Sequence, residues 1–180
     1  MNYEAIIDKY YPEDDALRRL LLKHSRQVAD RCLLVARRHP ELPLDVAFLE
    51  EAAMLHDIGI VKVDAPDIHC HGTEPYICHG VIGREMLDEL GLHRHALVCE
   101  RHTGAGITVQ DIVHQHLPLP HRDLLPVSLE EQIVCYADKF FSKTHVGAPA
   151  RTLEEARAKL AKFGVYALAR FDAMEALLGH

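Results

Sequence analysis

The apolar residues of this chain follow a helical pattern, and several of the apolar faces that this pattern predicts also carry titratable side chains. Apolar residues recur at helical spacing along most of the sequence, whereas two-residue alternation never persists beyond a few positions. Asp138 is the sharpest case, because Val134 lies at i−4 and Phe141 at i+3 on the same face. A carboxylate on an apolar face must be paired, protonated or bound to a metal. The chain is therefore expected to be all-α, with a polar site inside its core.

Start and stop signals set the boundaries of the expected helices. An acidic start at 13–15 opens a helix that Pro40 stops, and a second helix covers about 44–58 with Gly59 as its C-terminal cap. Residues 61–74 show little periodicity and are expected to form a loop. Further helices are expected over about 75–91, 93–101, 128–143, 152–164 and 165–178.

Composition and charge limit the compartment and the partners. A net charge of −7, from 27 acidic and 20 basic residues, argues against non-specific binding to nucleic acid or to an anionic membrane. The five cysteines lack CxxC spacing, and no apolar run has the length of a signal peptide or a membrane span, so a cytoplasmic protein is expected. Without a linker or an internal repeat, residues 1–180 are expected to form one domain, with core motifs at about 20–145 and C-terminal helices at 152–178 packed on it.

Six titratable residues face the core when each is compared with its neighbours one turn away. His24, for example, follows Leu20 and Leu21 and precedes Val28. A single inward histidine is most often a core residue satisfied by a neighbour, but four histidines and two aspartates from five helical segments indicate a site for one or two metal ions. Imidazole and carboxylate ligands without thiolate favour manganese, iron, cobalt or nickel over structural zinc. The set comprises His24, His56, Asp57, His79, His102 and Asp138.

The order of these residues resembles the signature of the HD-domain superfamily, and the tetrapeptide HDIG is the form that names its HDIG branch. The chain as a whole looks most like uncharacterised bacterial HDIG-domain phosphohydrolases. The resemblance implies an HD-domain helical bundle with a core of five or more helices around the metal site, and a metal-dependent phosphohydrolase. The matching stretches, all within about 20–145, are His24, 56–59 (HDIG), 79–83 (HGVIG), 99–106 (CERHTGAG) and Asp138.

The same resemblance implies the metal, the reaction and the role of each ligand. Iron or manganese is favoured as the metal, with cobalt, nickel, zinc and magnesium as alternatives. Two such ions would lower the pKa of a shared water toward about 7 and stabilise both the attacking and the leaving oxygen of an in-line displacement. The predicted partner is therefore a small phosphorylated molecule, nucleotide-like in character. One ion would take His24, His56, Asp57 and Asp138, and the other His79 and His102, with Asp57 bridging the two.

Four cationic residues are candidates for contacts to the substrate phosphate. Lys139 follows the last ligand and Lys62 follows the HDIG turn, so these two are assigned to catalysis together with Asp57. Arg101, beside the fifth ligand, and Arg122, in the long loop that follows it, are candidates for binding substrate. Each of the four cations is also plausible as an ordinary surface residue.

Two other functions stay open on the same ligand pattern. It also resembles that of the mixed-valent di-iron oxygenases of the HD superfamily, with 23 residues from His56 to His79 and another 23 to His102. A non-catalytic nucleotide-binding HD module is the second alternative, although such a module would be expected to lack a ligand and none is missing. The last apolar helix is expected to close the core, with pairing of two subunits into a homo-oligomer as the alternative.

Overall fold

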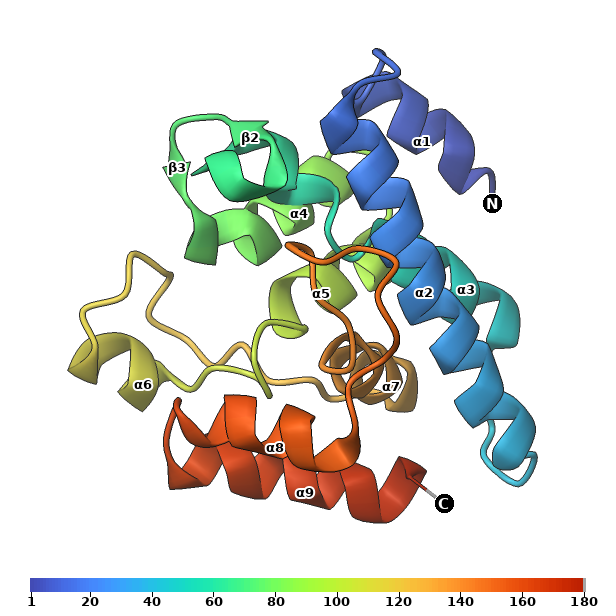
Figure 1. Ribbon diagram of the computed structural model, residues 1–180, viewed down its shortest axis with the longest axis vertical. Coiled ribbons are helices and arrows are strands. Elements are labelled where there is room, and N and C mark those ends of the chain that lie inside the picture. The colour runs from blue at the N-terminus through green and yellow to red at the C-terminus, as the bar shows by residue number, and fades with distance from the viewer. Residues whose placement is uncertain (180) are drawn as a thin grey trace.

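The computed structural model describes residues 1–179, and helices dominate it (Figure 1). This bears out the all-α prediction, apart from one small sheet. In the described part of the chain no helix combines the length and the apolar character needed to cross a lipid bilayer. The helices are α1 (Tyr3–Tyr10), α2 (Ala16–Arg38), α3 (Val46–Leu55), α4 (His79–Asp88), α5 (His93–Arg101), α6 (Val109–His114), α7 (Leu129–Asp138), α8 (Leu153–Ala161) and α9 (Val165–Leu178).

One hydrophobic core joins most of these helices. The long helix α2 packs on α3 and α7, and α4 packs on α5, so the two groups enclose the segment that follows α3. Buried side chains such as Leu21, Leu49 and Ile133 fill the space between them. Helices α8 and α9 lie side by side at the end opposite α1 (Figure 1) and add Leu160 and Phe171 to the same core. Full burial of each such side chain is worth about 1.5–3 kcal/mol.

The predicted end of the second helix was wrong, and the difference concerns Gly59. Helix α3 ends at Leu55 with His56 as its C-cap, and residues Ile58–Lys62 form a 3₁₀ helix. Gly59 is therefore no helix cap. A Cβ at this position would collide with the backbone of His79 and Gly83 in α4. Glycine is required here because the turn after α3 packs directly against α4.

The segment predicted to be a loop contains a three-stranded sheet. Strand β1 (Val63–Ala65) pairs antiparallel with β2 (Cys70–His71) and parallel with β3 (Glu74–Pro75), in the order β2-β1-β3. Strands of two or three residues are too short to produce a recognisable alternation. Pro75 ends β3 and is also the N-cap of a short 3₁₀ helix, Tyr76–Cys78, which leads directly into α4 at His79.

Thr152 opens α8 with a capping box, at the residue where a helix was expected to begin. Its hydroxyl accepts from the backbone N–H of Glu155, and the Glu155 carboxylate accepts from the backbone N–H of Thr152. Ser128 caps α7 in the same way, but the carboxylate of Glu131 accepts the backbone N–H of Val127 instead. Helix α7 also ends at Asp138, earlier than predicted. That early end leaves the following residues free to turn toward the centre of the molecule.

Candidate metal centre

The six predicted ligands meet at one buried place, although they come from five parts of the chain. Each lies at or near a helix end, except for the ligand on α2. All are at most 8 % exposed. His24 comes from α2, His56 and Asp57 follow α3, His79 begins α4, His102 caps α5, and Asp138 ends α7.

The first group of ligand atoms lies between α2, α3 and α7. His24 Nε2 is 3.0 Å from Asp138 Oδ1 and 3.3 Å from Asp57 Oδ2. His56 Nε2 is 3.2 Å from the same Asp57 oxygen and 3.7 Å from Asp138 Oδ1. Ligand atoms of His24, His56 and Asp57 all lie within 4.8 Å of one another, which is compatible with a single ion.

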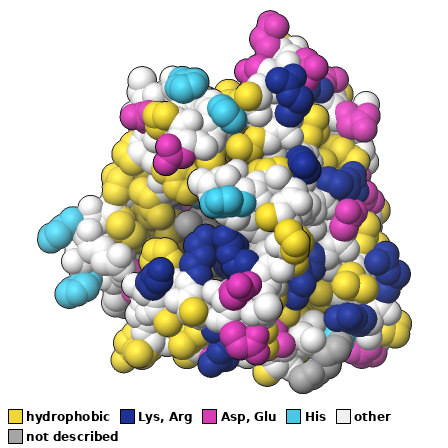
Figure 2. Space-filling view, viewed as in Figure 1, with side chains coloured by type: hydrophobic (Ala, Val, Ile, Leu, Met, Phe, Trp, Pro, Cys, Tyr) yellow, Lys and Arg dark blue, Asp and Glu magenta, His cyan; other side chains and the backbone are white. Residues whose placement is uncertain are grey.

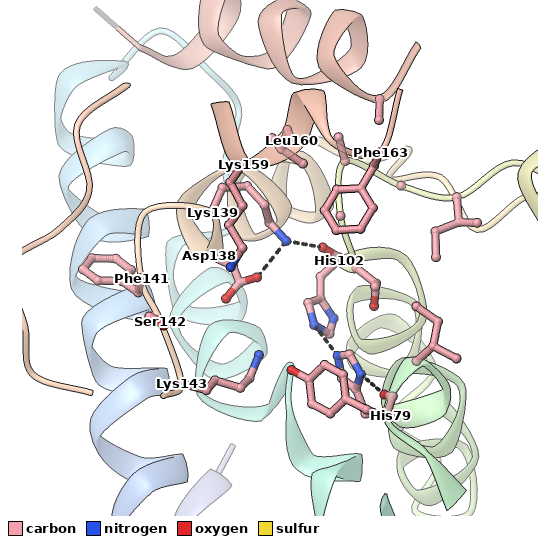
Figure 3. Close-up of a pocket in the computed structure, with 18 of the residues that line it drawn as sticks. His79, His102, Asp138, Lys139, Phe141, Ser142, Lys143, Lys159, Leu160 and Phe163 are labelled. Atoms are coloured by element: carbon pink, nitrogen blue, oxygen red, sulfur yellow. Dashed lines mark hydrogen bonds and ion pairs between the residues drawn. The ribbon is translucent and has the colours of Figure 1, made fainter. Parts of the chain in front are cut away.

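The second group shares Asp57 with the first. Asp57 Oδ1 is 3.5 Å from His79 Nε2 and 3.3 Å from His102 Nε2. The two imidazole nitrogens are themselves 3.1 Å apart (Figure 3). One oxygen of Asp57 thus faces each group. This is the arrangement that a carboxylate bridging two ions requires.

Backbone hydrogen bonds fix which nitrogen of three histidines is available. Nδ1 lies 2.7 Å from Ala53 O in His56, 2.7 Å from Tyr76 O in His79, and 2.8 Å from Cys99 O in His102. Because a carbonyl only accepts, each Nδ1 is the protonated donor. In the neutral imidazole Nε2 then keeps its lone pair, and in all three rings Nε2 points into the site, which is how hydrogen bonds to the other nitrogen orient metal-binding histidines.

Several buried polar atoms of the site lack a conventional partner. Within residues 1–179, His56 Nε2 and both carboxylate oxygens of Asp57 make no well-directed hydrogen bond, although Lys143 Nζ forms an ion pair with Asp57 Oδ2. Such atoms are costly to bury. The facing lone pairs of His79 and His102 add repulsion. Cations placed between these atoms would remove both costs, so the donor set fits one or two divalent ions.

The electrostatics of the site hold most ligands in the form that binds metal. Burial lowers the pKa of His79 to about 3 and also lowers the pKa of His102, which keeps both imidazoles neutral. Burial raises the pKa of Asp57, but the charges of His56 and Lys143 outweigh it and leave that pKa well below its usual range. His56 differs, because the two aspartates overcome the effect of burial and raise its pKa to about 9.

Two lysines lie against the ligands. Lys139 Nζ is 2.8 Å from Asp138 Oδ2 and donates to His102 O at 3.1 Å. Lys143 Nζ is 2.8 Å from Asp57 Oδ2. Burial lowers the pKa of Lys143, but Asp57 outweighs it and raises that pKa well above its usual value. Sequence reasoning missed Lys143, whose only signal was its position one turn beyond Lys139.

A pocket of about 710 Å³ opens onto the second group of ligands. His79, His102 and Asp138 lie at its base, with Lys139 and Lys143 beside them (Figure 3). Its other walls are largely apolar. Figure 2 shows the hollow from outside, with Lys and Arg side chains gathered beside it and hydrophobic side chains along another part of its rim. Such a pocket suits a small anionic molecule with an apolar part.

The other three predicted cations do not line this pocket. Arg101 pairs with Glu131 at 2.9 Å, and Arg122 pairs with Glu100. Both carboxylates are buried, so each arginine neutralises a charge that would otherwise be costly. Lys62 is exposed at the end of the 3₁₀ helix that follows the HDIG turn.

Comparison with known proteins gives a family and several relatives. The model of the HD domain matches residues 21–142. An uncharacterized protein of Methanocaldococcus jannaschii is 39% identical over 130 residues, which is 67% of this chain and 69% of that protein. No solved structure matches.

Two further relatives are named as tRNA (cytidine(56)-2′-O)-methyltransferases. The protein of Picrophilus torridus is 31% identical over 153 residues, covering 81% of this chain and 41% of the relative. The protein of Thermoplasma volcanium is 30% identical over 123 residues, covering 68% of this chain and 32% of the relative. The match therefore spans less than half of either methyltransferase.

Proposed function

The chain belongs to the HD domain family, and we propose that it is a metal-dependent phosphohydrolase of the HDIG branch. Its substrate would be a nucleotide or another small phosphoester, cleaved by a metal-activated water. The observation that carries this proposal is the carboxylate of Asp57, which presents one oxygen to each of two buried ligand groups. Lysines and an adjoining pocket complete the site on the side where a phosphate would enter.

His24, His56, Asp57 and Asp138 would hold one ion, and His79 and His102 would hold the other with the second oxygen of Asp57. When bound, two divalent ions would supply an activated water and stabilise charge on the attacking and leaving oxygens. The protein's own contribution is orientation. Because each Nδ1–H is bonded to a backbone carbonyl, the imidazole rings are held with Nε2 inward before any ion arrives.

Lys139 and Lys143 would bind and position the phosphate. Both side chains are nearly buried at the base of the pocket, where charge-assisted hydrogen bonds are strong. The raised pKa of Lys143 keeps its proton on Nζ, so it would act as a positive charge and not as a base. The hydrogen bond to His102 O fixes the position of Lys139. In this proposal Lys62, Arg101 and Arg122 make no substrate contact.

The HD-type di-iron oxygenase is the second candidate, because the same six ligands could hold two irons. The lysines beside Asp57 and Asp138 favour an anionic substrate, and so favour hydrolysis of a phosphoester. The non-catalytic nucleotide-binding module is less well supported, since all six ligands are present and face one another.

The test is a metal analysis followed by an activity screen. The full chain is assayed with Mn(II) or Fe(II) against nucleoside monophosphates and other small phosphoesters. The panel includes 2′-O-methylcytidine monophosphate, because two relatives are named for methylation at that position of a cytidine. Phosphate release that disappears in Asp57→Ala and persists in Asp64→Ala, an exposed aspartate nearby, supports the proposal. Oxygen uptake with a mixed-valence iron signal, and no phosphate release, contradicts it.

A further inference from the structure

One wall of the pocket comes from the C-terminal hairpin, which we define as α8, α9 and the turn between them. The family match ends at residue 142, so this hairpin lies outside it. It nevertheless supplies a substantial part of the pocket surface. Its lining residues are Ala156, Lys159, Leu160, Phe163, Ala167 and Arg170.

Arg170 fastens the C-terminal hairpin to the loop that follows His102. Its Nε donates to Ala105 O at 3.0 Å, and its Nη2 donates to Gly106 O at 3.0 Å. The same Nη2 lies 3.3 Å from a carboxylate oxygen of Asp111. A bidentate guanidinium of this kind sets the distance and the orientation of the hairpin relative to the ligands.

Packing against α7 holds the C-terminal hairpin from the other side. Phe171 is fully buried and stacks on Tyr136, with ring centroids 5.6 Å apart. The Tyr136 hydroxyl donates to the Glu175 carboxylate at 2.6 Å, and Leu160 is buried in the core. The hairpin is therefore a fixed wall of the pocket and not a mobile lid.

Lys159 is the lysine of this wall, and it differs from the lysines at the base of the pocket. Lys139 pairs with Asp138 and Lys143 pairs with Asp57. Lys159 forms no ion pair within residues 1–179, although it lines the pocket on the same side as Lys139 (Figure 3). Burial and the neighbouring cations lower its pKa. An unpaired ammonium among other cations is unfavourable in isolation, and a bound anion would relieve the repulsion.

Phe163 is the aromatic residue of this wall. It lies in the turn between α8 and α9, and its side chain is 60% exposed while lining the pocket. Tyr76 and Ile77 also line the pocket. A planar apolar group bound against Phe163 would cover its ring, and aromatic pairs gain energy beyond the area they bury.

We propose that the C-terminal hairpin determines substrate specificity: Lys159 binds the substrate phosphate together with Lys139, and Phe163 packs on an aromatic leaving group. The preferred substrates are then phosphoesters of a planar aromatic moiety, and small aliphatic phosphoesters are poor ones. This assignment rests on the proposed function for the orientation of the phosphate toward the ligands. It adds two residues that the ligand motifs do not contain.

The experiment measures binding of two non-hydrolysable probes, phenylphosphonate and methylphosphonate, to the full chain by calorimetry in Mn(II). The wild-type protein is expected to bind phenylphosphonate about tenfold more tightly, because the ring buries apolar surface. Phe163→Ala should weaken phenylphosphonate about fivefold and leave methylphosphonate unchanged. Lys159→Met should weaken both probes about tenfold, because both lose a charge-assisted contact.

Matched control variants lie on the same hairpin. Lys162→Met and Tyr166→Ala alter exposed residues that do not line the pocket, and both should bind each probe like the wild type. The inference is overturned if Lys159→Met and Phe163→Ala bind like the wild type, or if neither probe binds. If these variants bind the probes like the wild type while the protein still releases phosphate in a metal-dependent way, the proposed function stands and only the role of the hairpin is wrong. If the variants lose probe affinity as expected but the protein hydrolyses no phosphoester, the role of the hairpin is supported and the hydrolase proposal is contradicted.

Discussion

The two walls of the pocket differ in origin, charge and packing. The ligand wall comes from α2 to α7 and lies within the family match, and each of its six ligands lies within 3.5 Å of another ligand. The hairpin wall comes from α8 and α9 beyond that match. It presents the exposed Phe163 and also Lys159, which forms no ion pair in the part of the chain that the structure describes. The ligand wall contains the groups for chemistry. In the hairpin wall, Lys159 and Phe163 line the pocket and are available to a bound substrate.

This difference assigns metal binding and turnover to the ligand wall, and substrate selection to the hairpin wall. Changes in the ligand wall should alter metal content and turnover, because those side chains touch the ions or the reacting phosphate. Changes in the hairpin wall should alter KM and leave metal content intact. Four experiments test the ligand wall or the hairpin wall separately, from the largest expected effect to the smallest.

The largest effect is expected from Asp57→Asn. An amide cannot present two anionic oxygens to two ligand groups, so metal content should fall and kcat/KM should drop by about 10³-fold or more. Metal analysis and phosphate release measure both quantities. Asp64→Asn is the control, because Asp64 is exposed on β1. A variant that keeps both its metal and its activity would contradict the bridging role.

The second effect concerns pH and separates His56 from His79. The pKa of His56 is raised to about 9, so an ion that binds its Nε2 at neutral pH must displace a proton. Mn(II) affinity should therefore rise about tenfold per pH unit between pH 6 and 8, and binding should release protons into the buffer. His79 is neutral across this range and adds nothing to the slope. An affinity independent of pH would show that His56 is not a ligand.

Lys143→Met tests the base of the pocket. Removing a preorganised positive charge from the phosphate site should lower kcat by about 10²-fold. Metal content should be preserved, since an ammonium is no ligand. Lys9→Met, at an exposed lysine of α1, is the matched control. An unchanged kcat would remove Lys143 from the mechanism.

The smallest effect is expected from Arg170→Met, which removes the hydrogen bonds between the hairpin wall and the loop after His102. KM for an aromatic phosphoester should rise about tenfold, while kcat and metal content stay near the wild-type values. Arg157→Met breaks an ion pair inside the same hairpin, with Asp172, and should change KM little. A fall in kcat without a change in KM would show that Arg170 supports turnover, as the ligand wall does, and not substrate binding.

The ligand wall could be predicted from sequence because each ligand shows its character locally. Asp138 between Val134 and Phe141 identifies an inward carboxylate without knowledge of any other helix. The helix ends were harder. Gly59 looks like a cap in sequence, yet its real constraint is the backbone of α4, which only tertiary packing brings close.

The cations could not be sorted from sequence because their partners are distant. Arg101 and Arg122 are 30 and 22 residues from the carboxylates they neutralise. Lys143 lies beyond the end of α7, where no helical period indicates its direction. His95 lies in a polar stretch of sequence, yet it is buried with its Nε2 3.3 Å from Glu51, a partner 44 residues away. The hairpin wall depends entirely on such long-range contacts.

The most direct test is a crystal structure of the full chain grown with Mn(II) and phenylphosphonate, with anomalous differences recorded for manganese. Two anomalous peaks are expected on either side of the Asp57 carboxylate. The phosphonate should lie near Lys139 and Lys159, with the phenyl ring against Phe163. Manganese bound away from Asp57, or a phenyl ring directed away from the C-terminal hairpin, would contradict the division of the pocket into a metal wall and a specificity wall.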